Sequence, residues 1–209
     1  MQTAQRNLLL LSRYYWLTLL VFCAFVFSFV LYVRAEKAID HANEMRQQSL
    51  LLADELRQSS DDLTRMVRTY VVTGNPLYKQ HFQEILDIRN GKRPRPVDYQ
   101  NIYWDLVLGD DKRPQLAVAA PSLLERMHTA GFTPQEMAKL AEAKANSDAL
   151  THTEWAAMHL LESSTPIKEK NRQLAIRMLH DQAYHQAKAG IMGPIANSTG
   201  CRQSGRWMR

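Results

Sequence analysis

Residues 14–33 have the sequence YYWLTLLVFCAFVFSFVLYV, a run without any charged side chain that is flanked by Arg13 and Arg34. A helix rises about 1.5 Å per residue, so a run of this length covers roughly 30 Å, the thickness of the hydrocarbon core of a bilayer. Tyrosine or tryptophan lies at both ends, as in the aromatic belts of membrane interfaces. We therefore predict a membrane-spanning helix over residues 14–33.

Two other interpretations of an apolar N-terminal run fit less well. A cleaved signal peptide has a shorter apolar core, followed by a small-x-small cleavage site, whereas this run continues into VRAE at residues 33–36. A buried core helix usually carries polar residues on one side. Lys and Arg are nearly balanced on the two sides of the run, so charge alone does not fix the orientation. We expect residues 1–13 to be a short cytoplasmic tail and the bulk of the chain to lie outside the cytoplasm.

The composition allows one domain after the span. The formal net charge is +5, and the excess of Lys and Arg lies beyond residue 167. Such a basic end could contact nucleic acid or anionic lipid, but a solvated end is the preferred interpretation, and we expect no nucleic-acid partner. Cys23 lies inside the span and Cys201 near the C-terminus, so they cannot bridge within one monomer. Neither a disulfide framework nor a zinc pattern is present.

A helical pattern continues from the span to Thr73. Its stripe positions alternate in steps of three and four, as in a coiled coil; they are Ile39, Ala42, Arg46, Ser49, Ala53, Leu56, Ser60, Leu63, Val67 and Tyr70. Gly74 suits a left-handed helix end, and Pro76 cannot continue the helix.

The remainder of the chain predicts further helices and no convincing strand. Thr133, Pro134 and Glu136 form the strongest capping signal, with an N-cap, a first-turn proline and a reciprocal glutamate. Asp181 is a fair N-cap for the last helix. We expect helices over residues 77–89, 99–108, 122–129, 134–161, 171–179 and 183–192.

These expectations define an all-α protein. One N-terminal transmembrane helix precedes an up-and-down helical bundle with a long membrane-proximal helix. The bundle occupies residues 34–195 as a sensor-like extracytoplasmic domain. Residues 196–209 have no periodicity and are expected to be an irregular basic tail.

Three stretches of the chain carry a resemblance to bacterial transmembrane signalling proteins. They are SSDDLTRMVRTYVVTG at residues 59–74, ILDIRNGK at 85–92 with the following prolines and IYWD at 102–105, and the segment 130–150 from AGFT to NSDAL with Tyr184, His185 and Lys188 beyond it. Over residues 10–195 the chain resembles the N-terminal sensory region of methyl-accepting chemotaxis proteins, sensor histidine kinases and membrane-bound diguanylate cyclases.

The resemblance implies a helical region outside the cytoplasm, between two spans of the bacterial inner membrane. In those families a ligand or a redox state shifts the helices, and a cytoplasmic output domain responds. This sequence has no second apolar span after Val33 and no GGDEF stretch, kinase phospho-acceptor region or methylation helices. We therefore expect a receptor that lacks its output domain, through truncation or frameshift.

Asp61, Asp62, Arg65 and Arg68 are the most suggestive charged group. Spacings of three and four place Asp61 with Arg65 and Arg68 near one helical face. Arginine forks there could bind a carboxylate ligand. Ion pairing on the helix surface, which contributes little stability, is the preferred interpretation.

An aromatic group at Tyr99, Tyr103 and Trp104, with Asp105 beside it, could line a small-molecule pocket. Such aromatic residues more often bury area in a bundle. Tyr70 is expected to join them in either case.

Sequence motifs for catalysis or metal binding are missing. The seven histidines are scattered, and none has the spacing of an HExxH site. We find no phosphate loop, nucleophile elbow or assignable acid–base pair. The prediction is a protein without enzymatic activity, metal site or cofactor.

The sequence favours a membrane-anchored signal-input domain of a signal-transduction or chemotaxis receptor. Its expected partners are the lipid bilayer, a small-molecule ligand and a second copy of the chain, because stripes of this kind commonly self-pair. The alternative is a membrane-anchored helical module that holds a partner protein without sensing a ligand.

Overall fold

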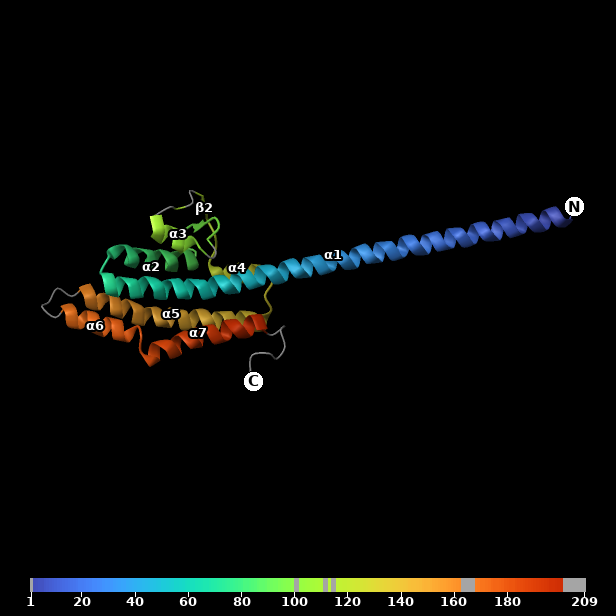
Figure 1. The fold of residues 1–209 in the computed structure, drawn as a ribbon. Helices are drawn as coiled ribbons and strands as arrows, with labels where there is room; N and C mark the ends of the chain where they lie inside the picture. The colour runs from blue at the N-terminus through green and yellow to red at the C-terminus, as the bar shows by residue number, and fades with distance from the viewer. Residues whose placement is uncertain (1, 100–101, 111–112, 114–115, 163–167, 201–209) are drawn as a thin grey trace. The chain divides into compact units, whose positions relative to one another are not determined.

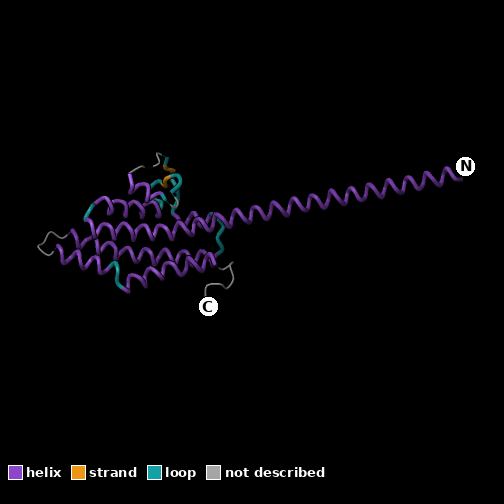
Figure 2. The backbone as a smooth tube through the Cα atoms, in the orientation of Figure 1, coloured by secondary structure: helices purple, strands orange, loops and turns teal. Residues whose placement is uncertain are grey.

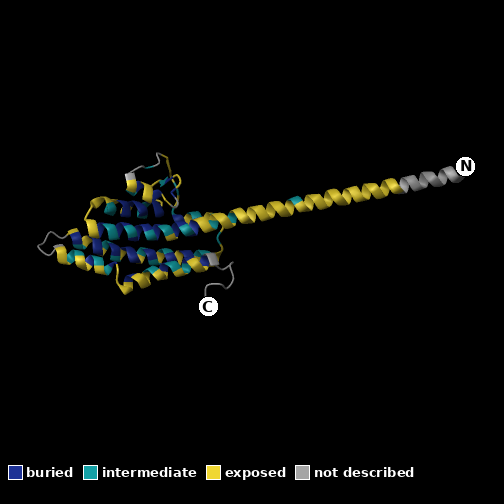
Figure 3. Cartoon of the chain, in the orientation of Figure 1, coloured by how far each residue is buried: buried dark blue, intermediate teal, exposed yellow. Residues whose placement is uncertain are grey.

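The computed structural model describes residues 2–99, 102–110, 113, 116–162 and 168–200. The chain forms two compact units, Met1–Gln47 and Gln48–Arg209. The long helix α1, Gln2–Thr73, contributes to both (Figure 1). In the described part of the first unit, residues 2–47, it is the only element, and from residue 14 on its side chains are almost all exposed (Figure 3). Within the described residues, α1 is the one helix that is long and apolar enough to cross a membrane.

The second unit is a helical bundle, which confirms the predicted all-α fold class. Figure 2 shows helices along almost the whole trace. After α1 the helices are α2 Pro76–Arg89, α3 Tyr103–Asp110, α4 Leu123–Thr129, α5 Pro134–Glu162, α6 Lys168–Met178 and α7 Gln182–Gly200. Helix α5 packs against both α6 and α7. Two strands that the sequence did not predict, β1 Arg95–Pro96 and β2 Ala117–Val118, form a short antiparallel pair.

The stripe of α1 divides into an exposed and a buried part. Ile39, Ala42 and Arg46 are exposed, whereas every stripe position from Ala53 to Tyr70 is buried. The apolar residues among these buried positions belong to the hydrophobic core of the second unit, to which every other helix of that unit also contributes. This half of the predicted coiled-coil pattern is therefore explained by packing within one chain.

The predicted helix ends are largely confirmed. Gly74 has a φ of 70° and follows the last residue of α1, as expected for a left-handed cap. The capping box at Thr133 forms in both directions, with Thr133 Oγ1 accepting from Glu136 N at 3.3 Å and Glu136 Oε2 accepting from Thr133 N at 2.9 Å. Asp181 Oδ1 accepts a hydrogen bond from Tyr184 N at 2.8 Å.

Three boundaries differ from the prediction. Helix α3 begins at Tyr103 rather than at residue 99, and α6 begins at Lys168 rather than at 171. Helix α7 does not end near residue 192 but continues through Pro194 to Gly200, into the segment expected to be an irregular tail. The rest of that tail, including Cys201, lies outside the described residues.

The continuation of α7 past Pro194 is explained by contacts with α5 and the core. A proline in a helix has no N–H for the carbonyl four residues earlier, which here is that of Gly190. Asn146 of α5 donates to this carbonyl oxygen from Nδ2 at 3.0 Å. Ile191 and Ile195 are buried on the same side of α7, so packing favours the helix on both sides of the proline.

The turn after α2 lies close to the start of α4. Gly91 has a φ of 70°, and a Cβ atom built on it would lie 2.7 Å from the backbone nitrogen of Ser122. Ser122 is the N-cap of α4, with its hydroxyl accepting from Glu125 N. Glycine is therefore required at position 91 for both its backbone conformation and its close contact.

Candidate functional site

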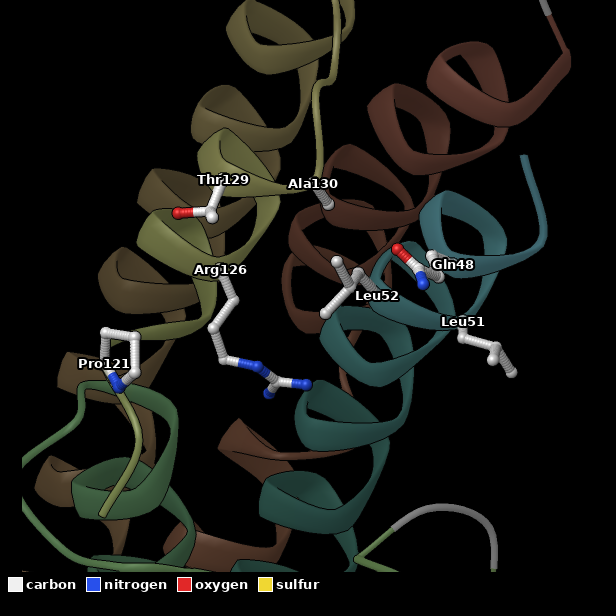
Figure 4. A pocket seen from close by; sticks show the side chains of 7 residues that line it. All are labelled: Gln48, Leu51, Leu52, Pro121, Arg126, Thr129 and Ala130. Atoms are coloured by element: carbon white, nitrogen blue, oxygen red, sulfur yellow. The ribbon is translucent and has the colours of Figure 1, made fainter. Parts of the chain in front are cut away.

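An open pocket lies between α1 and α4 in the second unit (Figure 4). Its volume is about 400 Å³, which is within the usual range for small-molecule sites. Arg126 extends from α4 toward α1 (Figure 4). The lining residues are Gln48, Leu51, Leu52, Pro121, Arg126, Thr129 and Ala130. The pocket thus combines an apolar wall with a few polar groups, as ligand sites commonly do.

A buried carboxylate holds the arginine that lines this pocket. Glu55 of α1 has a side chain that is 6% exposed, and its Oε1 accepts from Arg126 Nη1 at 2.7 Å. Arg95 of β1 binds the same carboxylate through both of its oxygens, at 3.1 and 3.0 Å. The Arg95 guanidinium also lies over the ring of Tyr99. Three elements are therefore joined at one carboxylate.

The charges of this cluster do not cancel. Two guanidinium groups stay protonated at any accessible pH, and among the described residues Glu55 is the one carboxylate that pairs with either of them. The cluster therefore carries a net charge of about +1 by this count. Because Arg126 lines the pocket and Arg95 does not, the excess positive charge is accessible from the pocket side.

A second polar cluster lies inside the bundle. Glu154 of α5 is 2% exposed. Its Oε1 is 2.7 Å from Tyr184 OH, which in turn is 3.0 Å from Thr64 Oγ1. Thr64 Oγ1 also donates to the carbonyl of Ser60 at 3.0 Å. The contacts form one chain of oxygens from α5 through α7 to α1.

Burial favours the neutral form of Glu154. It raises the pKa of Glu154 to about 7, although the hydrogen bond that Tyr184 donates to this carboxylate and the nearby cations oppose the rise.

The charged residues singled out from the sequence lie at contacts between helices. Arg65 pairs with Asp62 at 2.7 Å and with Asp105 of α3, and not with Asp61 as the spacing suggested. Burial raises the pKa of Asp62 to about 6. Asp61 pairs instead with Arg57 at 3.0 Å and with Lys188 of α7 at 2.9 Å.

Arg68, the last member of that charged group, binds the backbone of the bundle. Its Nε and Nη2 donate to the carbonyl of Leu179 at 3.1 and 2.7 Å. Its guanidinium also lies over the ring of Tyr184, 5.1 Å from the centroid. These donors stabilise the chain between α6 and α7.

The aromatic residues predicted as alternative pocket walls are buried in the core. Tyr99, Tyr103 and Trp104 are at most 6% exposed and contact one another edge-on or tilted. Trp104 Nε1 donates to Tyr99 OH at 3.1 Å. Tyr70 belongs to the same hydrophobic core. The pocket beside Arg126 is lined by other residues, so this structure favours the packing interpretation for these rings.

Sequence reasoning missed the pocket residue Arg126 and its buried partner Glu55. They are 71 positions apart, and neither belongs to a recognisable motif. The one available signal was a glutamate on the inward side of the α1 stripe, next to Leu56, where a buried charge requires a partner. The described residues contain no group of three or more His, Cys, Asp or Glu side chains placed to hold a metal ion.

Comparisons of the chain with protein-family models, with curated proteins and with solved structures find no match.

Proposed function

We propose that this chain is the signal-input domain of a bacterial membrane receptor. In this proposal residues 14–33 anchor it in the inner membrane, the helical bundle lies outside the cytoplasm, and a small molecule binds in the pocket between α1 and α4. The observation that carries the proposal is that α1 contains the candidate span and also supplies Gln48, Leu51 and Leu52 to the pocket.

The mechanism is a shift between two packings of α4 against α1. Arg126 and Glu55 already connect these helices, so a ligand beside Arg126 contacts both sides of the connection. A ligand that prefers one packing shifts the equilibrium by no more than its difference in affinity for the two. Because α1 is one helix in both units, a displacement of its pocket segment is the input that the receptor would pass toward the membrane.

A second copy of the chain completes the proposal. Ile39 and Ala42 are exposed on the part of α1 that belongs to the first unit. Apolar positions at coiled-coil spacing favour pairing of two parallel helices. A homodimer through this part of α1 would leave the pocket residues of each copy in their own bundle.

The ligand hypothesis is tested by thermal unfolding of the full chain in lipid nanodiscs, screened against a library of small metabolites. We expect at least one compound to raise the unfolding temperature. Thr129→Trp, at an exposed pocket position on α4, should abolish that increase by filling the pocket. A complete absence of stabilising compounds, or an increase that Thr129→Trp leaves unchanged, would overturn ligand sensing at this pocket.

A different function, docking of a partner protein, is favoured by one observation. Four large apolar side chains at α3 and β2 are more than half exposed. Leu106 lies on α3 and Val118 on β2, while Ile102 and Leu116 come directly before these elements. Exposed apolar groups of this kind often mark interaction sites. Fusions at the C-terminus separate the two functions, because alkaline phosphatase activity indicates an extracytoplasmic bundle, and fluorescence of a cytoplasmic reporter indicates the docking module in the cytoplasm.

A further inference from the structure

We propose that the pocket between α1 and α4 takes a small carboxylate with an apolar body, and that Arg126 binds the carboxylate group. The inference rests on the proposed ligand-sensing function and names the chemical class of the ligand.

The charge of the site selects an anion. Arg126 donates to Glu55 through one nitrogen, Nη1, and its side chain is 23% exposed and lines the pocket. A guanidinium presents five N–H donors in a fixed fork, so a single bond to Glu55 leaves donors for a second carboxylate. Since Arg95 also neutralises Glu55 through two contacts, Glu55 does not cancel the charge of Arg126.

The other residues that line the pocket indicate which chemical groups the ligand carries besides its carboxylate. Leu51, Leu52, Pro121 and Ala130 provide an apolar wall, while Gln48 and Thr129 are the uncharged polar residues. An apolar body of the ligand would bury area against the leucines and proline, which favours binding by the hydrophobic effect. An inorganic anion makes none of these apolar contacts, so the site favours an organic acid over phosphate or sulfate.

The contacts of Arg126 also explain how binding of a carboxylate would change the packing of α4 against α1. A carboxylate on the remaining donors of Arg126 shares its positive charge with Glu55 and so weakens the attraction between them, while Glu55 stays paired with Arg95. The ligand can therefore weaken the connection between α4 and α1 without leaving a buried charge unpaired, a state that would be costly. A neutral ligand of the same shape has no such effect on the Arg126–Glu55 pair.

The test compares two acids with their uncharged amides: butyrate with butanamide, and benzoate with benzamide. Binding to the full chain in nanodiscs of zwitterionic lipid is measured by calorimetry, with empty nanodiscs correcting for partition into lipid. We expect each acid to bind at least tenfold more tightly than its amide, because only the carboxylate brings a negative charge to Arg126 and can accept two parallel hydrogen bonds from its guanidinium. Added salt should reduce the preference.

Variants locate the site. Arg126→Gln should remove the acid preference without unfolding the bundle, since the bidentate contact with Arg95 still satisfies Glu55. Arg126→Lys keeps the charge without the fork and should retain part of the preference. Arg57→Gln is the matched control, because it removes an arginine from α1 whose ion partners, Asp54 and Asp61, lie outside this pocket; it should bind both acids normally.

Three results overturn the inference. If acid and amide bind equally and Thr129→Trp abolishes both, the pocket is a ligand site of another class, and the sensor proposal stands without this inference. If the acids bind but Arg126→Gln does not weaken them, Arg126 is not the anchor. If neither acid binds, the carboxylate class is wrong, and the sensor proposal is decided separately by the metabolite screen and the fusion experiment.

Discussion

Asn146 of α5 donates a hydrogen bond to the carbonyl oxygen of Gly190 in α7, and Gly190 lies four residues before Pro194. The side chain thus takes the place of the backbone N–H that proline lacks. It connects two helices at the point where one of them has lost a hydrogen bond of its own.

Replacing Asn146 by alanine should lower the free energy of unfolding by up to about 1 kcal/mol, because the exposed Gly190 carbonyl then has no donor in the protein and is left to water. In a Pro194→Ala background the new N–H of residue 194 can reach the same carbonyl, so the cost of Asn146→Ala should shrink. Thermal or denaturant unfolding of the four proteins in a double-mutant cycle measures this coupling. If Asn146→Ala lowers the free energy of unfolding equally in the natural chain and in the Pro194→Ala background, Asn146 does not compensate for the missing N–H of the proline.

Protonation of Glu154 should make stability depend on pH. An exposed glutamate has a pKa near 4.3, whereas that of Glu154 in the folded bundle is about 7. The folded state therefore binds a proton that the unfolded state has already lost between these values, and the stabilisation is present at low pH and disappears as pH rises through about 7. Glu154→Gln mimics the protonated carboxyl and should remove this dependence.

The measurement is the free energy of unfolding of the natural chain minus that of Glu154→Gln. Between about pH 5 and about pH 8 we expect this difference to fall by up to about 3 kcal/mol. Taking the difference removes the contribution of Asp62, whose burial also raises its pKa, to about 6. A difference that stays flat, or that rises with pH, would show that Glu154 is ionised throughout.

Substitutions in the aromatic cluster of Tyr99, Tyr103 and Trp104 should lower the stability of the fold and should not act through ligand binding. Tyr99→Phe removes the hydroxyl that accepts from Trp104 Nε1, and the loss should cost about 1–3 kcal/mol because the indole N–H is buried. In a Trp104→Phe background, which has no such donor, the cost of Tyr99→Phe should be smaller. Loss of ligand binding by Tyr99→Phe at unchanged stability would instead support the pocket interpretation of these residues.

Two glycines with the same backbone conformation should differ in their tolerance of alanine. Gly74 and Gly91 both have a φ of 70°, but a Cβ atom at Gly74 meets nothing closer than 3.9 Å. Gly74→Ala should cost about 1–2 kcal/mol, the strain of a left-handed residue. Gly91→Ala adds the contact with Ser122 and should cost at least about 1 kcal/mol more. If Gly74→Ala and Gly91→Ala lower the unfolding temperature equally, the backbone at Gly91 is not packed tightly against Ser122.

Local features of the sequence predicted most of the helices. Gly74, Asp181 and the capping box at Thr133 act within one turn of the chain, so their effect can be inferred without knowing the fold. The continuation of α7 past Pro194 could not be inferred in this way. It depends on Asn146, which lies 44 residues before Gly190, the residue whose carbonyl it binds.

The candidate site was hidden from the sequence for the same reason. Arg126 and Glu55 come together only because α4 packs beside α1. No neighbour in the sequence marks Arg126, and Glu55 is marked only by its position on the inward side of the α1 stripe. The charged group at residues 61–68 did attract attention, because its members are close in sequence. In the folded chain its partners are mostly distant: Asp105, Leu179 and Lys188.

The division of the α1 stripe has a consequence for stoichiometry. From Ala53 to Tyr70 the stripe is covered by the chain's own helices. Two copies that pair along this stripe therefore contact each other through the turns nearer the N-terminus, around Ile39 and Ala42. Each copy would then keep its own complete helical bundle. In the proposed dimer each copy therefore has its own cavity, and no cavity is shared across the symmetry axis.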